Sequence, residues 1–266
     1  MKKCAVINDI SGFGKCSLTA SVPVLSVMGI QVCPVVTGVF SNQTGYDSYE
    51  SADLTDMLPR VTCQWEKLSP HFDGILTGFL LCAKQYEYVL GFIDTFKRQD
   101  TLFLADPVMA DDGKIYSTYT PEMVEGVKRL CAKADIITPN LTELRILSGE
   151  DDIMLAGEKL LDSGIKSVIV TGVVEDGKVS NYVFDSGKAE KYSSDFIESP
   201  TEGGSFSGTG DIFSAVLIGD VLNGAALKDA TAHAMQVVRD IIRDNLNKEE
   251  KFFGVDIERY ISEGKL

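Results

Sequence analysis

The segment Leu102-Phe103-Leu104-Ala105-Asp106 is a short apolar run that ends on a carboxylate. Helix-forming patterns flank it at 86–97 and 121–132, and a second apolar run follows at 135–138. Runs that are apolar at every position are typical of strands buried on both faces of a sheet. Their alternation with helices predicts an α/β fold, a three-layer sandwich in which helices cover both faces of a mostly parallel central sheet.

The same alternation extends over the rest of the chain. Strands are predicted at 3–10, 31–40, 74–78, 167–171, 179–184 and 189–195, and the last two form a hairpin. Helices are predicted at 15–28, 53–68, 142–147 and 153–163, and three more begin at Asp211, Ala226 and Asp256. The 266 residues contain no linker-like segment, low-complexity segment or repeat, which favours a single domain over 1–266.

The composition argues against several classes of protein. A formal net charge of −14 does not suit a surface that binds nucleic acid or an anionic membrane. The six cysteines are scattered without a C-x-x-C pair and there are two histidines, so free thiols are expected and not disulfides or a zinc site. No run approaches the ~20 apolar residues of a membrane span, and the first run, 4–7, is too short for a signal peptide. We expect a cytoplasmic protein.

The segment Ser207-Gly208-Thr209-Gly210-Asp211 directly precedes an apolar helix pattern at 212–218. Free N–H groups and the positive dipole end of a helix form an anion site, and glycines let a ligand approach the backbone closely. The same dipole favours the ionised form of Asp211, which makes this carboxylate a candidate base. An anion cradle with a base suits phosphoryl transfer to a hydroxyl group. The structural alternative is that Thr209 caps the helix and the glycines form a turn.

Further polar residues lie at the carboxyl ends of predicted strands: Asp9, Asp106, Thr138, Asn140 and Thr171. Ligands bind at the carboxyl ends of the strands in sheets of this kind. The oxygen-bearing side chains of Asp106, Asn140 and Glu143 suit Mg²⁺ held through water and substrate phosphates. The structural alternatives are that Glu143 is an ordinary first-turn residue of a helix and that 111–113 is an ordinary turn.

The Gly-Thr-Gly-Asp segment, Asp-Pro-Val-Met at 106–109 and Thr-Pro-Asn-x-x-Glu at 138–143 occur together in the ribokinase-like small-molecule kinases. Within that superfamily the chain resembles the pyridoxal/pyridoxine/pyridoxamine (vitamin B6) kinases. The pattern at 106–113 and the segment Ser-Asn-Gln-Thr-Gly-Tyr at 41–46 carry the closer likeness. The resemblance extends from about residue 4 to about residue 245. It implies phosphorylation of the 5′-hydroxymethyl group of vitamin B6 by ATP, with Mg²⁺ and a monovalent cation such as K⁺. We also expect a homodimer.

The resemblance also implies roles for individual residues. Asp211 resembles the base, and the backbone of Gly208, Thr209 and Gly210 resembles the anion hole for the transferred phosphoryl group. Asp106, Asn140 and Glu143 resemble the residues that order Mg²⁺ and its waters. Thr138 and Thr171 resemble residues that contact the ATP phosphates, and 111–116 the loop that closes over ATP, beginning at Asp111. Asp9 and Thr44 resemble positions that contact the pyridine ring.

Two positions depart from the vitamin B6 kinase pattern. Asp9 stands where those kinases often have serine, and Phe79 stands where they often have tyrosine, although Phe79 can still stack on the substrate ring. The alternatives are therefore a kinase for another small alcohol, such as hydroxymethylpyrimidine, a nucleoside or a sugar, and a non-catalytic regulator that binds a nucleotide or vitamin B6. Hydroxymethylpyrimidine kinases usually have cysteine in place of Asp211, and a regulator does not need the base.

Overall fold

The computed structural model describes residues 1–197, 206–246 and 253–266. Its centre is a nine-stranded sheet with the strand order β11-β10-β9-β8-β5-β4-β1-β2-β3. The strands of this sheet are β1 (Lys3–Phe13), β2 (Gln31–Asn42), β3 (Ser51–Asp53), β4 (Gly74–Thr77), β5 (Leu102–Ala105), β8 (Ile136–Ile137), β9 (Ser167–Glu175), β10 (Lys178–Asp185) and β11 (Lys188–Asp195). The pairs from β2 to β9 are parallel, whereas β3, β10 and β11 pair antiparallel at the two edges. The predicted mostly parallel sheet is confirmed.

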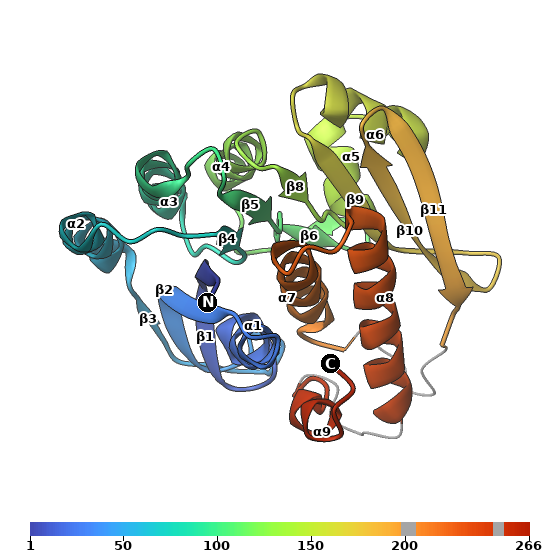
Figure 1. Cartoon of the computed structure of the whole chain (residues 1–266), viewed down its shortest axis with the longest axis horizontal. Coiled ribbons are helices and arrows are strands. Elements are labelled where there is room, and N and C mark those ends of the chain that lie inside the picture. The colour runs from blue at the N-terminus through green and yellow to red at the C-terminus, as the bar shows by residue number, and fades with distance from the viewer. Residues whose placement is uncertain (198–205, 247–252) are drawn as a thin grey trace.

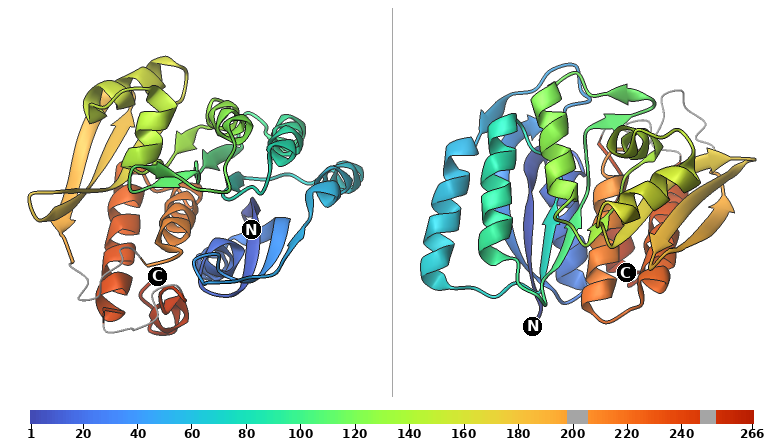
Figure 2. Two further views of the ribbon diagram at one scale, coloured as in Figure 1. Left: turned by 180° about the vertical axis from the view of Figure 1, so that it is seen from behind. Right: turned by 90° about the horizontal axis from the view of Figure 1, so that it is seen from above.

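Helices cover both faces of this sheet (Figure 1). One face is covered by α1 (Ser17–Val27), α7 (Thr209–Leu222), α8 (Leu227–Asp244) and α9 (Ile257–Ser262). The other face is covered by α2 (Leu58–Leu68), α3 (Ala83–Phe96), α4 (Pro121–Cys131), α5 (Leu141–Ser148) and α6 (Ile153–Asp162). Figure 2 shows α2, α3 and α4 in a row along that face. Each face buries its own apolar core, so the predicted three-layer sandwich is confirmed.

Two predicted elements differ most in their bounds. The helix predicted from residue 53 begins at Leu58, because Asp53 ends β3 and its carboxylate accepts the N–H of Thr55 in a turn at 2.7 Å. A short 3-10 helix, Thr55–Met57, and Pro59 in the first turn then lead into α2. β9 continues to Glu175 and not to Thr171, since it pairs antiparallel with β10 beyond the parallel sheet.

A small hairpin of β6 (Ala110–Asp111) and β7 (Lys114–Ile115) lies outside the main sheet. It coincides with the segment whose resemblance implies a loop that closes over ATP. Its turn places Asp112 and Gly113 at positive φ, a conformation that glycine adopts without strain. In the chain the hairpin follows β5 and the carboxylate of Asp106.

Candidate active site

Asp211 lies in the first turn of α7, half-buried beside β1 and the start of α1. Its Oδ1 accepts the side-chain N–H of Asn8 at 3.0 Å, and its Oδ2 accepts the backbone N–H of Ser17 at 2.8 Å. Burial, together with the negative charge of Asp9, raises the pKa of Asp211 to about 6, against the lowering effect of these two donors. The net shift of this pKa is therefore opposite to the effect expected from the helix dipole. The carboxylate is nevertheless mostly ionised at neutral pH.

The two glycines before Asp211 serve different purposes. Gly208 is the N-cap residue of α7, in place of the alternative Thr209, and has a φ of 80°. A Cβ atom on Gly208 would lie 1.8 Å from the backbone oxygen of Lys15. This glycine is therefore needed for close packing against the protein backbone and not for the approach of a ligand. Among the residues that the structure describes, a Cβ on exposed Gly210 would meet only Asp106 Oδ2, at 3.9 Å. Open space for a ligand therefore lies at Gly210, between α7 and Asp106. The Thr209 hydroxyl donates a hydrogen bond to the Phe206 carbonyl.

Alanine at each glycine should separate structure from catalysis. Gly208→Ala should lower the free energy of unfolding by more than about 2 kcal/mol, because the new Cβ meets backbone at a positive φ. Gly210→Ala should keep the parent melting temperature but lower kcat, since the methyl group enters the space beside Asp106. Denaturant unfolding and steady-state kinetics of both variants check this. A destabilised Gly210→Ala would contradict it.

Asp106 follows β5 and faces Asp211. The Ser214 hydroxyl on α7 donates to Asp106 Oδ2 at 3.0 Å and lies 3.1 Å from the Thr138 hydroxyl. Burial, then the charge of Asp211, raises the pKa of Asp106 to about 7. A small recess joins these groups, and it is lined by Asn8, Ser21, Leu76, Thr77, Gly78, Asp106, Asp211 and Ser214. The fully buried Thr77 hydroxyl has no hydrogen-bond partner within the described residues.

Asn140 and Glu143 form a capping box at the start of α5. Asn140 also donates to the Ala110 carbonyl at 2.7 Å, while Glu143 accepts backbone N–H groups of Asn140, Met109 and Ala110 at 2.9, 3.0 and 3.4 Å. Burial, then the charge of Asp106, raises the pKa of Glu143 to about 8. The pair thus anchors the β6–β7 hairpin to α5, a contact that the segment 138–143 alone does not reveal.

Glu143→Gln should loosen this anchor. An amide presents an NH₂ group to at least one of the three backbone N–H groups, and leaving such a donor without an acceptor costs ~1–3 kcal/mol. We expect a lower free energy of unfolding and faster hydrogen exchange at 109–115. Glu150→Gln, at an exposed ion pair with Lys159, is the matched control and should change neither quantity. Unchanged exchange at 109–115 in Glu143→Gln would contradict the anchor.

The residues expected at the substrate ring lie around β1, β2 and β4. Asp9 is buried within β1, which continues to Phe13 past a register shift, and it accepts the hydroxyls of Ser11 at 3.1 Å and Ser17 at 2.5 Å. Thr44 is exposed in the turn after β2. Phe79 follows β4, with Phe40 and Tyr119 6.3 and 6.1 Å away between ring centroids. Phe79 thus stands in an aromatic wall, whereas both oxygens of Asp9 face serines.

The residues expected at ATP lie along β8, β9 and the hairpin. Thr138 is buried directly after β8, within reach of Ser214. Thr171 lies inside β9 and not at its end, half-buried, and pairs with Asn140 through an isolated parallel bridge. Asp111 is exposed in β6, where it accepts the N–H of Asp112. These three elements meet beside Asp106 and Asn140.

The four acids at the site have no protein cation as an ion-pair partner in the part of the chain that the structure describes. Within 1–197, 206–246 and 253–266, no Lys, Arg or His forms an ion pair with Asp9, Asp106, Glu143 or Asp211. The same residues contain no group of three or more His, Cys, Asp or Glu side chains placed to hold a metal ion by themselves. With the unpartnered Thr77 hydroxyl, this donor set fits an Mg²⁺ ion that keeps waters and substrate phosphates as its other ligands.

Sequence reasoning missed three polar residues of the site. Asn8 and Ser17 hold Asp211, and Ser214 joins Asp106 to Thr138. Ser214 lies three residues after Asp211, so helical spacing places both side chains on one face of α7. That signal was available, whereas the contacts of Asn8 and Ser17 cross about 200 residues of chain.

The chain is similar to known kinases. The phosphomethylpyrimidine kinase family matches residues 18–256. A structure from Bacteroides thetaiotaomicron, assigned provisionally as a phosphomethylpyrimidine kinase and described with pyridoxal, is 36% identical. It has a TM-score of 0.92 and covers 100% of this chain and 96% of that chain. A pyridoxal kinase from Dictyostelium discoideum is 25% identical over 258 residues, 89% of this chain and 82% of the relative.

A more distant structure supports the fold. The pyridoxal kinase from Leishmania donovani in complex with ADP and ginkgotoxin is 23% identical, with a TM-score of 0.86 and coverage of 100% of this chain and 96% of that chain. The fold and site together define a kinase with the ribokinase-like architecture. The chain belongs to the phosphomethylpyrimidine kinase family, whose match spans most of its length.

Proposed function

We propose that this chain transfers a phosphoryl group from ATP to the 5′-hydroxymethyl group of vitamin B6, forming the 5′-phosphates of pyridoxal, pyridoxine and pyridoxamine. The observation that carries the proposal is the position of Asp211. Its carboxylate is held by two donors at the N-terminus of α7, beside open space at Gly210. The likeness to a structure described with pyridoxal favours vitamin B6 over the pyrimidine, nucleoside and sugar alternatives. A non-catalytic regulator would not need this carboxylate.

Asp211 would take the proton of the substrate hydroxyl as the oxygen attacks the γ-phosphorus. Such a transfer needs in-line positioning and neutralisation of charge on the phosphoryl oxygens more than covalent help from the protein. The first N–H groups of α7 have no acceptors within the helix, so those at Thr209 and Gly210 suit the phosphoryl oxygens. Gly208 belongs to this cradle through the shape that it gives the backbone.

Mg²⁺ would supply positive charge between the ATP phosphates, and Asp106 is the residue best placed to hold it through water. Asn140 and Glu143 would act indirectly, since their side chains form hydrogen bonds with the hairpin backbone and so hold it in place. We extend the proposal to a monovalent cation such as K⁺ in the same acidic surroundings. The absence of ion-paired Lys, Arg or His at the four acids of the described chain supports added cations.

The remaining assignments divide between the two substrates. For the ring we propose Phe79 and its aromatic neighbours as a stacking wall, with Thr44 at the rim and Asp9 acting through Ser11 and Ser17. For ATP we propose Thr138 and Thr171 near the phosphates, and the β6–β7 hairpin with Asp111 as the cover.

We propose that the chain works as one domain over 1–266, as a homodimer, in the cytoplasm. A single main sheet with one apolar core on each face supports the first assignment. Six cysteines with free thiols support a reducing compartment. No helix within the described residues is long and apolar enough to cross a membrane.

An ATP-coupled assay tests the function. The purified chain is given Mg²⁺, K⁺ and ATP with pyridoxal, pyridoxine, pyridoxamine, hydroxymethylpyrimidine or ribose. We expect the highest kcat/KM with a B6 vitamer and no turnover with ribose. A preference for hydroxymethylpyrimidine would overturn the assigned substrate, and binding of vitamer and nucleotide without turnover would overturn the assigned enzyme.

A further inference from the structure

Asn8 has a buried side-chain amide that lies between the candidate base, Asp211, and the aromatic wall at Phe79. Its side chain is 4% exposed, and it lies on β1 just before the register shift. Nδ2 donates to Asp211 Oδ1 at 3.0 Å, while Oδ1 accepts the backbone N–H groups of Phe79 at 2.9 Å and Asp9 at 3.0 Å. One side chain thus connects β1, the segment after β4 and the first turn of α7.

The neighbours of Asn8 fix the direction of its amide. Two backbone N–H groups point at one end, so that end must be the oxygen, and the NH₂ group must face Asp211. Gly78 makes room for it, because a Cβ on Gly78 would lie 2.4 Å from Asn8 Nδ2. The donor that Asn8 presents to Asp211 therefore cannot turn away.

Two donors define the plane of the Asp211 carboxylate. The Ser17 backbone N–H holds Oδ2, and Asn8 holds Oδ1. The negative charges of Asp9 and Asp106 lie close enough to disfavour the ionised form of Asp211, and the Cys16 thiol is also nearby. Within the described residues, Asn8 is thus the one side chain that donates to the Asp211 carboxylate, and two further acids, Asp9 and Asp106, oppose the charge of that carboxylate.

We propose that Asn8 is a positioning residue for the phosphoryl transfer: it aims the Asp211 carboxylate and fixes its separation from the wall at Phe79. This inference rests on the proposed role of Asp211 as the base. Asn8 itself does not touch the reacting atoms, so its effect on rate should pass entirely through Asp211.

A double-mutant cycle tests this dependence. Asn8→Asp keeps the shape and the acceptor for the Phe79 and Asp9 N–H groups but removes the donor to Asp211. In the parent background we expect kcat to fall by about 10- to 100-fold, the loss that corresponds to one hydrogen bond to a charged group, with KM for ATP unchanged. In the Asp211→Asn background, the same change should cause no further loss of kcat.

Stability gives a second readout of the same contact. The single variant Asn8→Asp sets two carboxyl groups against each other and should melt below the parent. In the double variant, the amide introduced at 211 can donate to the carboxylate introduced at 8, so the melting temperature should recover. Losses in kcat that multiply, or a double variant that melts below both single variants, would overturn the inference.

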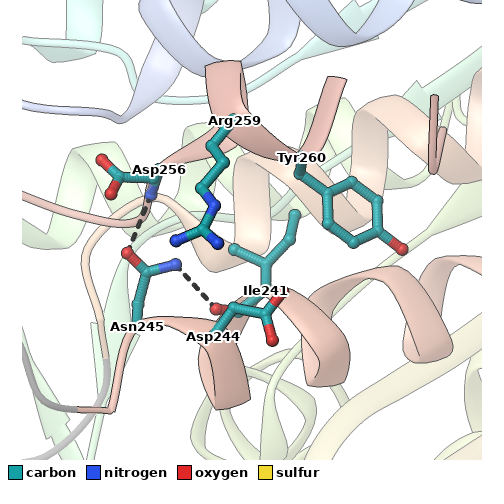
Figure 3. A pocket seen from close by; sticks show the side chains of 6 residues that line it. All are labelled: Ile241, Asp244, Asn245, Asp256, Arg259 and Tyr260. Carbon is teal, nitrogen blue, oxygen red and sulfur yellow. Dashed lines mark hydrogen bonds between the residues drawn. The ribbon is translucent and has the colours of Figure 1, made fainter. Parts of the chain in front are cut away.

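Asn245→Asp is the matched control. Asn245 is also 4% exposed, donates to the Ile241 carbonyl at 2.8 Å and accepts the N–H of Asp256 at 3.1 Å, at the junction of α8 and α9 (Figure 3). Its replacement should lower the melting temperature but leave kcat at the parent value in both backgrounds. If the parent protein prefers another alcohol, only the proposed substrate is overturned. The double-mutant cycle is then measured with that alcohol.

Discussion

Replacing Asp211 with asparagine is expected to lower kcat by about 10²–10⁴-fold, the usual loss when a general base is removed. The amide cannot take the proton of the attacking hydroxyl. KM for ATP should stay near the parent value, because the backbone N–H groups of α7 are unchanged. Steady-state kinetics with saturating vitamer and varied ATP measure both quantities.

The stability of Asp211→Asn should stay close to that of the parent, for two opposing reasons. An amide cannot accept from both Asn8 and Ser17, which leaves one donor against NH₂ at a cost of ~1–3 kcal/mol. Removing a buried charge beside Asp106 and Asp9 offsets that loss. Asp220→Asn, on the same helix where Asp220 pairs with His233 at 2.6 Å, is the control and should keep kcat. An Asp211→Asn variant with most of the parent kcat would remove Asp211 from the mechanism.

Replacing Asp106 with asparagine is expected to stabilise the ligand-free protein at pH 8 while it abolishes most of the activity. The pKa of Asp106 is about 7 in the folded chain, against 3.8 for an unperturbed carboxyl group. The folded chain therefore binds the proton of Asp106 more tightly than the unfolded chain does. This difference adds to the free energy of unfolding below pH 3.8, and the added stability is lost as the pH rises through 7. The slope for one group is about 1.4 kcal/mol per pH unit within that window. Ser214 can still donate to the amide oxygen.

Denaturant unfolding from pH 4 to pH 8 checks the sign. The parent should lose stability over this range more steeply than Asp106→Asn, and the variant should be the more stable of the two at pH 8. Asp135→Asn provides the opposite control. Although burial raises the pKa of Asp135, Lys166, the Phe103 N–H and Lys97 together lower it, so this variant should be less stable than the parent at neutral pH. Parallel pH profiles for the parent and Asp106→Asn would contradict the raised pKa of Asp106.

Local patterns in the sequence determined the frame of this protein. Apolar runs such as 102–106 predicted the buried parallel strands, since every position of such a strand meets a helix layer. The glycines and Asp211 before an apolar helix predicted the N-terminus of α7, because that signal lies within five consecutive residues. The order of the motifs along the chain predicted the kinase family. These features depend on neighbours in sequence, so the sequence alone reveals them.

The tertiary structure alone decided what each site residue touches. Gly208 is required by the backbone of Lys15, while Gly210 opens onto Asp106, although the two look alike in the motif. The pKa of Asp211 is raised and not lowered, because burial and the charge of Asp9 outweigh the hydrogen bonds that Ser17 and Asn8 donate. Asn8 reaches Asp211 across 203 residues of chain. Burial, close approach and the direction of a hydrogen bond depend on partners from distant segments, and local sequence carries no record of those partners.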